Sequence, residues 1–171
     1  LIEEDHLPDV EMMLSYIYRE LGEPEKCIEY YQKFLKLREA APDMTQDARY
    51  MLDITRIALA QYLYDAGRYD EAVAEAQKVI SAAEAISWTS DLWRALSLIG
   101  RAQEKLGNKD SALQSLKKAI EVIESQRGGL GAGDDRASFL EKHIGVYREI
   151  IRLLIGMGAA DEALDYLERS K

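Results

Sequence analysis

The chain has 171 residues, a formal net charge of −9, a pI near 4.8 and a hydrophobic fraction of 47%. This acidity argues against a nucleic-acid partner, because phosphate binding requires clustered positive charge. No apolar run reaches the roughly 18 residues of a membrane span, so we expect a folded protein that has no membrane partner.

The first half of the chain has the pattern of two helical hairpins, predicted at 8–40 and 45–87. In the first hairpin, Pro24 suits the opening turn of the second helix, where its missing N–H costs no hydrogen bond. Thr45 stands before the next periodic run and is the predicted N-cap of a helix. Apolar residues recur at helical spacing through both hairpins, as expected of helices that share a core.

The second half predicts two more hairpins, at 91–126 and 135–171. Thr89-Ser90-Asp91 supplies a capping signal before the third hairpin. Between the hairpins, the glycine-rich stretch at 127–134 is the predicted flexible linker. The chain begins without an initiator methionine and its helical pattern runs to the last residue. We therefore expect a single repeat domain over 1–171 that is a fragment of a longer protein.

A glycine, four variable residues and a small residue recur in the turn of every predicted hairpin. Glycine can adopt the left-handed backbone that ends many helices, and a small residue lets the next helix approach closely. Self-similarity of this kind predicts a helical solenoid, in which neighbouring hairpins share their cores. The four copies are Gly22–Cys27, Gly67–Ala72, Gly107–Ala112 and Gly158–Ala163.

These segments resemble the tetratricopeptide repeat over most of the chain. The resemblance implies an all-α fold, a right-handed α-solenoid of about four helix–turn–helix hairpins. The glycines are farther apart than the roughly 34 residues of the standard repeat, so we expect longer helices and linkers. The resemblance also implies that the first helix of each hairpin lines a concave groove, where a protein or peptide binds.

Aligned on the glycines, the groove positions of the first two hairpins are partly apolar and aromatic, and those of the last two are rich in arginine. We expect the arginines to bind an acidic peptide, with Tyr16 and Tyr64 adding stacking and apolar contacts. The alternative is that the arginines pair with acids of adjacent helices. The candidate groove residues are Met12, Tyr16, Arg19, Gln61, Tyr64, Arg94, Arg101, Arg148 and Arg152.

A narrower resemblance covers the last third of the chain. It is similar to the repeat region that precedes a CHAT domain, a caspase-like module of many bacterial proteins. In that family the catalytic His and Cys lie in the CHAT domain itself, so the resemblance implies a neighbouring peptidase and no activity in this chain. The matching segments are Ala119–Arg127, Arg136–Leu140, Val146–Tyr147, Leu153–Leu154, Gly158, Glu162–Leu164 and Glu168–Lys171.

The residues themselves predict no catalytic centre, metal site or cofactor. Cys27 falls on a small core position, so we expect it to pack in the interior, as free cysteines often do. Because it is the only cysteine, no intramolecular disulfide can form, and a reducing cytoplasm is the expected location. His6 and His143 are too few for a metal site. The glycine stretch lacks the Lys-Ser/Thr of a phosphate loop.

The sequence thus predicts a non-catalytic protein–protein interaction scaffold, with the recognition arm of a CHAT-type peptidase as its implied setting. One alternative is a self-association module. The terminal hairpins of such an array expose apolar faces that would pair in a homodimer. The other alternative is a ligand or peptide sensor segment of a bacterial regulator.

Overall fold

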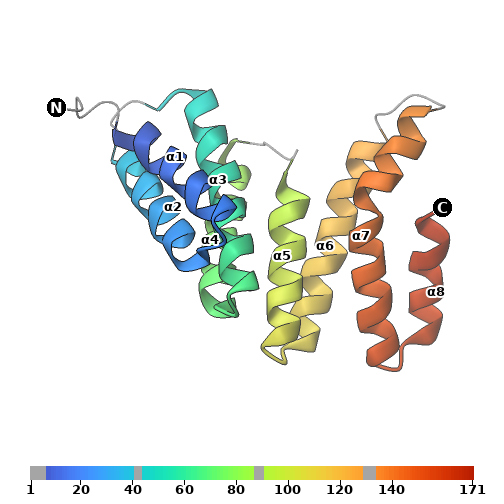
Figure 1. Ribbon diagram of the computed structural model, residues 1–171. Helices are drawn as coiled ribbons and strands as arrows, with labels where there is room; N and C mark the ends of the chain where they lie inside the picture. Colours follow the sequence, from blue (N-terminus) through green and yellow to red (C-terminus); the bar gives the residue numbers. More distant parts are fainter. Residues whose placement is uncertain (1–6, 41–43, 87–90, 129–133) are drawn as a thin grey trace. The chain divides into compact units, whose positions relative to one another are not determined.

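The computed structural model describes residues 7–40, 44–86, 91–128 and 134–171, and all regular structure in these ranges is α-helical. This confirms the predicted all-α fold of about four hairpins. None of the described helices is long and apolar enough to cross a membrane. In chain order the helices are α1 (Leu7–Glu20), α2 (Pro24–Glu39), α3 (Gln46–Asp65), α4 (Tyr69–Ile86), α5 (Leu92–Lys105), α6 (Lys109–Arg127), α7 (Asp134–Gly156) and α8 (Ala160–Arg169) (Figure 1).

Every hairpin turn contains a glycine with positive φ, as the sequence predicts. The φ angles are 70°, 77°, 83° and 80° at Gly22, Gly67, Gly107 and Gly158. In each turn, the N–H after the glycine donates to a carbonyl five residues earlier, as Arg68 N–H does to Leu63 O at 2.8 Å. This hydrogen bond is that of the Schellman motif, which satisfies a carbonyl at the end of the first helix and reverses the chain.

The small residue five positions after each glycine is buried, which confirms its predicted packing role. These residues are Cys27, Ala72, Ala112 and Ala163. Each lies in the first turns of a second helix, where a larger side chain would separate the two helices of the hairpin. In each hairpin, the local sequence thus determines both the turn and the distance between the two helices that the turn joins.

Two of the predicted helix starts are confirmed and one is wrong in detail. Pro24 is the first residue of α2, and the Thr45 hydroxyl accepts a hydrogen bond from Ala48 N at 3.2 Å. Asp91 does stand before α5, but its side chain makes no capping hydrogen bond. It pairs instead with Arg94, at 3.4 Å. His6, Thr89, Ser90 and 129–133 lie outside the described residues.

The chain forms two compact units, the first unit from Leu1 to Val79 and the second unit from Ile80 to Lys171. In the first unit, buried residues of α2 pack with those of α3. In the second unit, α6 packs between α5 and α7, and α8 covers part of the same core. The first core contains Cys27, Ile28, Tyr31, Phe34, Leu35, Leu52, Leu59, Leu63 and Ala72. The second contains Leu96, Ala112, Leu116, Ala119, Ile120, Ile123, Val146, Tyr147, Ile150, Leu153, Leu154, Ala163 and Tyr166.

Candidate binding surfaces

The predicted groove residues fall in both units, and all of them lie on first helices. The first unit holds Met12, Tyr16 and Arg19 on α1, with Gln61 and Tyr64 on α3. The second unit holds four arginines, Arg94 and Arg101 on α5 and Arg148 and Arg152 on α7.

In the first unit, three tyrosines form a continuous aromatic contact, which we call the tyrosine row. The Tyr16 ring meets the edge of Tyr31 at 6.5 Å between centroids, and Tyr31 stacks on Tyr62 at 5.6 Å. Tyr31 is buried, and burial raises the pKa of its hydroxyl to about 12. Tyr16 keeps 43% of its surface exposed. The tyrosine row therefore leaves the Tyr16 ring partly exposed at the surface, in contact with the buried ring of Tyr31.

Arg19 lies beside the exposed end of the tyrosine row. Its guanidinium carbon is 5.1 Å from the centroid of the Tyr16 ring, within cation–π range. The same guanidinium donates two hydrogen bonds to Glu20 Oε1, at 3.0 and 2.8 Å. Tyr16 and Arg19 thus form one exposed aromatic and cationic patch on α1. The sequence analysis did not identify Tyr62, which stacks on Tyr31 behind this patch.

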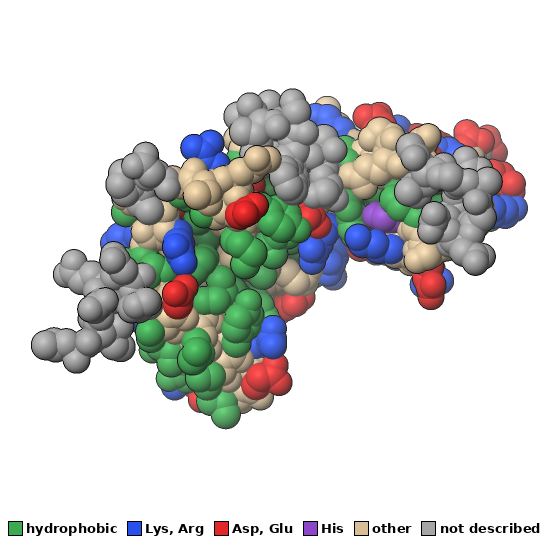
Figure 2. All heavy atoms as spheres, turned by 90° about the horizontal axis from the view of Figure 1, so that it is seen from above, with side chains coloured by type: hydrophobic (Ala, Val, Ile, Leu, Met, Phe, Trp, Pro, Cys, Tyr) green, Lys and Arg blue, Asp and Glu red, His purple; other side chains and the backbone are tan. Residues whose placement is uncertain are grey.

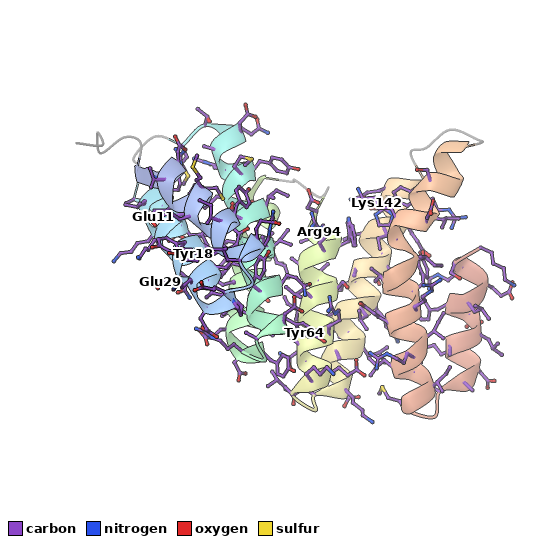
Figure 3. All side chains as sticks on the ribbon, viewed as in Figure 1. Glu11, Tyr18, Glu29, Tyr64, Arg94 and Lys142 are labelled. Atoms are coloured by element: carbon purple, nitrogen blue, oxygen red, sulfur yellow. The ribbon has the colours of Figure 1, made fainter. Side chains whose placement is uncertain are left out.

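The other three groove candidates of the first unit have local partners. Met12 packs against the core from α1. Gln61 donates to Asp65 Oδ1 at 2.8 Å. Tyr64, near the end of α3 (Figure 3), contacts the ring of Tyr69 at 5.4 Å between centroids. Met12 and Tyr64 thus pack against the same core as the tyrosine row.

In the second unit, α5 and α7 are linked by a charged network made of Ser97, Arg101, Glu104, Glu149 and Arg152. Arg152 donates to both carboxylate oxygens of Glu104, at 2.9 and 2.5 Å. Ser97 Oγ donates to Glu149 Oε2 at 2.8 Å, and Arg101 Nε lies 3.5 Å from Glu149 Oε1. The network joins two first helices by polar contacts above the apolar core that α6 and α7 share.

Glu149 is the electrostatic centre of this network. Burial raises the pKa of its carboxyl, and the hydrogen bond from Ser97 and the charge of Arg101 offset only part of that effect. Because a partly buried carboxylate is stabilised by a nearby cation, Glu149 and Arg101 hold each other in place. Arg101 is therefore not an uncommitted cation.

The other two arginines differ in their partners. Arg94, at the start of α5 (Figure 3), pairs with Asp91 one turn earlier. Arg148 is exposed, and no carboxylate of the described residues lies within ion-pairing distance of it. Arg101 and Arg152 thus pair with acids of an adjacent helix, as the internal-pairing alternative states, whereas Arg94 pairs with the residue that precedes its own helix. Arg148 is the one most open to an external carboxylate.

Cys27 and the described histidine are core residues. Cys27 is fully buried, as expected, and burial raises the pKa of its thiol. His143 is also buried, and its Nδ1 is 2.6 Å from Phe139 O. Desolvation lowers the pKa of its imidazole. Across the described ranges, no group of three His, Cys, Asp or Glu side chains is arranged to hold a metal ion.

Comparison with protein families identifies the repeat. Models described as tetratricopeptide repeat match residues 12–40 and residues 50–125, which together make up more than half of the chain. The chain belongs to the tetratricopeptide-repeat family. A comparison with curated proteins finds no significant match to this sequence.

Several solved tetratricopeptide-like structures share the fold at low sequence identity. The apo form of RapI superposes with a TM-score of 0.74 at 15% identity, covering 96% of this chain and 54% of RapI. Aspartyl phosphate phosphatase F from Bacillus subtilis gives 0.75 at 18% identity, covering 99% and 40%. Repeats of a putative kinesin light chain from Podosopora anserina give 0.70 at 16%, covering 99% and 75%. The repeat chain thus spans about half the length of RapI and less of the phosphatase.

Proposed function

We propose that this chain is a non-catalytic scaffold that binds a protein or peptide segment on the surfaces of its first helices. The observation that carries the proposal is the exposed patch of Tyr16 and Arg19 on α1. Tyr16 packs against Tyr31, which itself stacks on Tyr62, and this contact reduces the side-chain freedom that is lost when a partner covers Tyr16. Supported aromatic and arginine side chains are the types that dominate binding energy in protein interfaces.

The chemistry of the patches favours a segment with acidic side chains. Arg19 on the first unit and Arg148 on the second unit are exposed cations on a chain of net charge −9. A carboxylate can make a bidentate contact with Arg148, and with Arg19 once it replaces the exposed Glu20. Arg101 and Arg152 are already neutralised by Glu149 and Glu104, so an acidic segment would have to displace a carboxylate to reach them.

A selection from a random peptide library tests this function without knowledge of the natural partner. We expect the selected peptides to be enriched in acidic and aromatic residues and to bind less tightly as salt rises. Tyr16→Ala should weaken peptides that bind the first unit, and Arg148→Glu those that bind the second unit, each at least tenfold while the helical content stays unchanged. The matched control is Met51→Ala, which alters an exposed apolar side chain of α3. Peptides that bind both variants as well as the unaltered chain would contradict the proposal.

The kind of larger protein to which this scaffold belongs is a separate hypothesis. The resemblance of residues 119–171 to the repeats before a CHAT domain supports a role as the recognition arm of a caspase-like peptidase. The reading frame beyond Lys171 tests it. A following domain with a separated His and Cys on strand ends would support this role, and a different domain would leave an adaptor or a sensor of a regulator.

A further inference from the structure

One side of α7 carries a continuous line of exposed residues at the positions that the tetratricopeptide resemblance assigns to the groove. Gly145, Arg148, Arg152 and Ile155 are all exposed, and they recur at i, i+3, i+7 and i+10 along the helix. This spacing places them on the side of α7 opposite the residues that are buried in the core of the second unit. We call these four residues the α7 strip.

Gly145 stands in the middle of the 23-residue helix α7 without a packing reason. A Cβ there would meet no atom of the described chain within 4 Å, whereas a Cβ at Gly100 would collide with Leu116. Glycine inside a helix lowers its stability relative to alanine, because glycine loses more backbone freedom on folding. Packing within the chain thus explains Gly100 and leaves Gly145 unexplained. A glycine on an exposed helix face allows the main chain of a partner to approach closely.

The two arginines of the α7 strip differ in what they can still bind. Arg152 donates to both carboxylate oxygens of Glu104, so this pair is close to neutral. Figure 2 shows Lys and Arg side chains among Asp and Glu side chains over the second unit. Arg148 is exposed and lies beyond ion-pairing distance of every described carboxylate. The strip therefore offers one cation for an external carboxylate, with a neutralised pair beside it.

The other end of the α7 strip is apolar, because Ile155 is 61% exposed. Counted from the turn glycines, its position holds Arg19, Tyr64 and Glu104 in the other hairpins, and none of these residues is buried. The exposure of Ile155 is therefore a property of this groove position in every hairpin, inner hairpins included. An isoleucine at this position offers an apolar contact where the other hairpins offer a polar or aromatic one.

The spacing of these residues sets the pattern of side chains that fits them. At a rise of 1.5 Å per residue, Arg148 and Ile155 are about 10 Å apart along α7. An extended chain rises about 3.3 Å per residue, so about three residues span that distance. Gly145 lies one turn beyond Arg148, on the side away from Ile155.

We propose that an extended peptide segment of a partner lies along the α7 strip, with an acidic side chain on Arg148 and an apolar side chain on Ile155. Its main chain continues past the acidic residue and passes closely over Gly145. The inference rests on the proposed function and deepens it, because it names the sequence pattern that the second unit selects. That pattern is an acidic and an apolar residue with about two residues between them.

The probes are the library-selected peptides that lose affinity for the Arg148→Glu variant, because these peptides bind the second unit. We expect them to share the acidic and apolar pattern, in either chain direction. Fluorescence anisotropy with labelled peptides measures their affinity for the unaltered chain, for Gly145→Ala and for Ile155→Ser. Glu121→Ala, at an exposed position of α6, is the matched control.

Gly145→Ala should weaken peptide binding at least tenfold and at the same time raise the thermal midpoint. The added methyl meets nothing within the described chain and improves helix propensity, so the fold gains stability while the partner loses its close approach. A loss of affinity combined with a gain of stability does not arise from damage to the fold. Glu121→Ala should leave the affinity unchanged.

Ile155→Ser should weaken binding at least tenfold, and only for peptides that keep their apolar residue. When that residue of the peptide is replaced by serine, the unaltered chain and Ile155→Ser should bind equally well. This comparison shows whether the two side chains meet, because removal of either one should cost as much as removal of both.

Three results would overturn the α7 strip and leave the proposed function intact. They are an unchanged affinity for Gly145→Ala, an Ile155→Ser effect that persists without the apolar residue of the peptide, and a library whose peptides all retain their affinity for Arg148→Glu. A library that yields no binding peptide at all would overturn the proposed function, and this inference with it.

Discussion

Gly100 in α5 faces Leu116 in α6 so closely that a Cβ at position 100 would lie 2.7 Å from Leu116 Cγ. The same Cβ would be 3.2 Å from the carbonyl oxygen of Ala112. The corresponding pair in the second hairpin is Ala60 with Ala76, both buried. The third hairpin thus combines the smallest residue on its first helix with a large one on its second.

This packing predicts that Gly100→Ala changes the free energy of unfolding in opposite directions in the presence and absence of the Leu116 side chain. Gly100→Ala should lower the stability of the second unit, because overpacking costs about 1–3 kcal/mol and exceeds a helix-propensity gain of about 1 kcal/mol. In a Leu116→Ala background the clash with Leu116 Cγ is gone and only the 3.2 Å contact with the Ala112 carbonyl remains, so the helix-propensity gain should exceed the cost and the same change should stabilise by less than about 1 kcal/mol. Urea denaturation of the four proteins measures both effects. An equal effect of Gly100→Ala in the two backgrounds would refute the packing explanation.

The charged network predicts a pH-dependent cost for the loss of Arg101. In Arg101→Gln, the carboxylate of Glu149 loses its nearest cation while Ser97 remains bonded to it. We expect a loss of about 1–3 kcal/mol near neutral pH, the range for a poorly compensated buried polar group. The raised pKa of Glu149 means that acidification protonates it and removes the need for a cation, so the loss should shrink as pH falls.

Arg148→Gln is the matched control for this experiment, because Arg148 directly precedes Glu149 in α7 but is exposed. Its effect on the free energy of unfolding should stay within about 0.5 kcal/mol at every pH. A cost of Arg101→Gln that stays constant from neutral to acidic pH would show that Glu149 is not the group that requires it.

The burial of His143 predicts that the second unit becomes less stable to unfolding in mild acid. Burial lowers the pKa of its imidazole in the folded state, and Lys142 lowers it further, so the unfolded chain binds the proton more tightly. The stabilising effect of the neutral ring is complete above the unfolded pKa of about 6.5 and is lost as pH falls through the folded value.

The expected slope contributed by His143 is at most about 1.4 kcal/mol per pH unit within that interval. Thermal unfolding followed by circular dichroism across this pH range measures it. His143→Phe removes the titrating ring, and we expect the variant to lose this component of the slope. If the slope persists in the variant, another group is responsible.

The hydrogen bonds of Glu124 predict that the C-terminal end of α8 opens locally when they are lost. Its carboxylate accepts hydrogen bonds from Arg169 at 2.8 and 2.6 Å and from the Tyr147 hydroxyl at 3.2 Å. Chiefly because of Arg169, the pKa of Glu124 is lowered, so this support is present above the usual glutamate pKa and is lost as pH falls through the lowered value.

We expect Glu124→Gln to speed amide hydrogen exchange in residues 160–169 by about tenfold, equivalent to about 1.4 kcal/mol of local opening. Exchange in α5 should change little. Glu121→Gln alters an exposed acid of the same helix and is the control. Uniform acceleration across the whole second unit would instead indicate that Glu124 supports the entire core.

The turns of this fold are predictable from sequence because their causes are local. Gly22 and Gly67 are required where the backbone turns left-handed, Pro24 and Thr45 start helices, and Cys27 is small where helices meet. Each signal acts within a few residues. The resemblance to the repeat then extends these local signals to four hairpins.

The candidate surfaces are less predictable because their partners come from elsewhere in the chain. The family pattern placed Arg101 and Arg152 on first helices, but Glu149 lies 48 residues from Arg101. One signal for Glu149 was available. Counted from the turn glycines, its position holds Met13, Ala58 and Leu98 in the other hairpins, so an acid there is unusual. The burial of His143 had no comparable signal, because an isolated histidine is equally common on a surface.

The distribution of aromatic residues gives each unit its own optical signal. Both tryptophans fall within residues 80–171, whereas eight of the ten tyrosines fall within residues 1–79. Emission from Trp93, the tryptophan within the described ranges, therefore reports on the second unit, and tyrosine absorbance reports mainly on the first. Trp93 also contacts His143 at 4.6 Å between ring centroids. Since a protonated imidazole quenches a neighbouring indole, the chain contains an intrinsic fluorescent indicator for the charge state of its buried histidine.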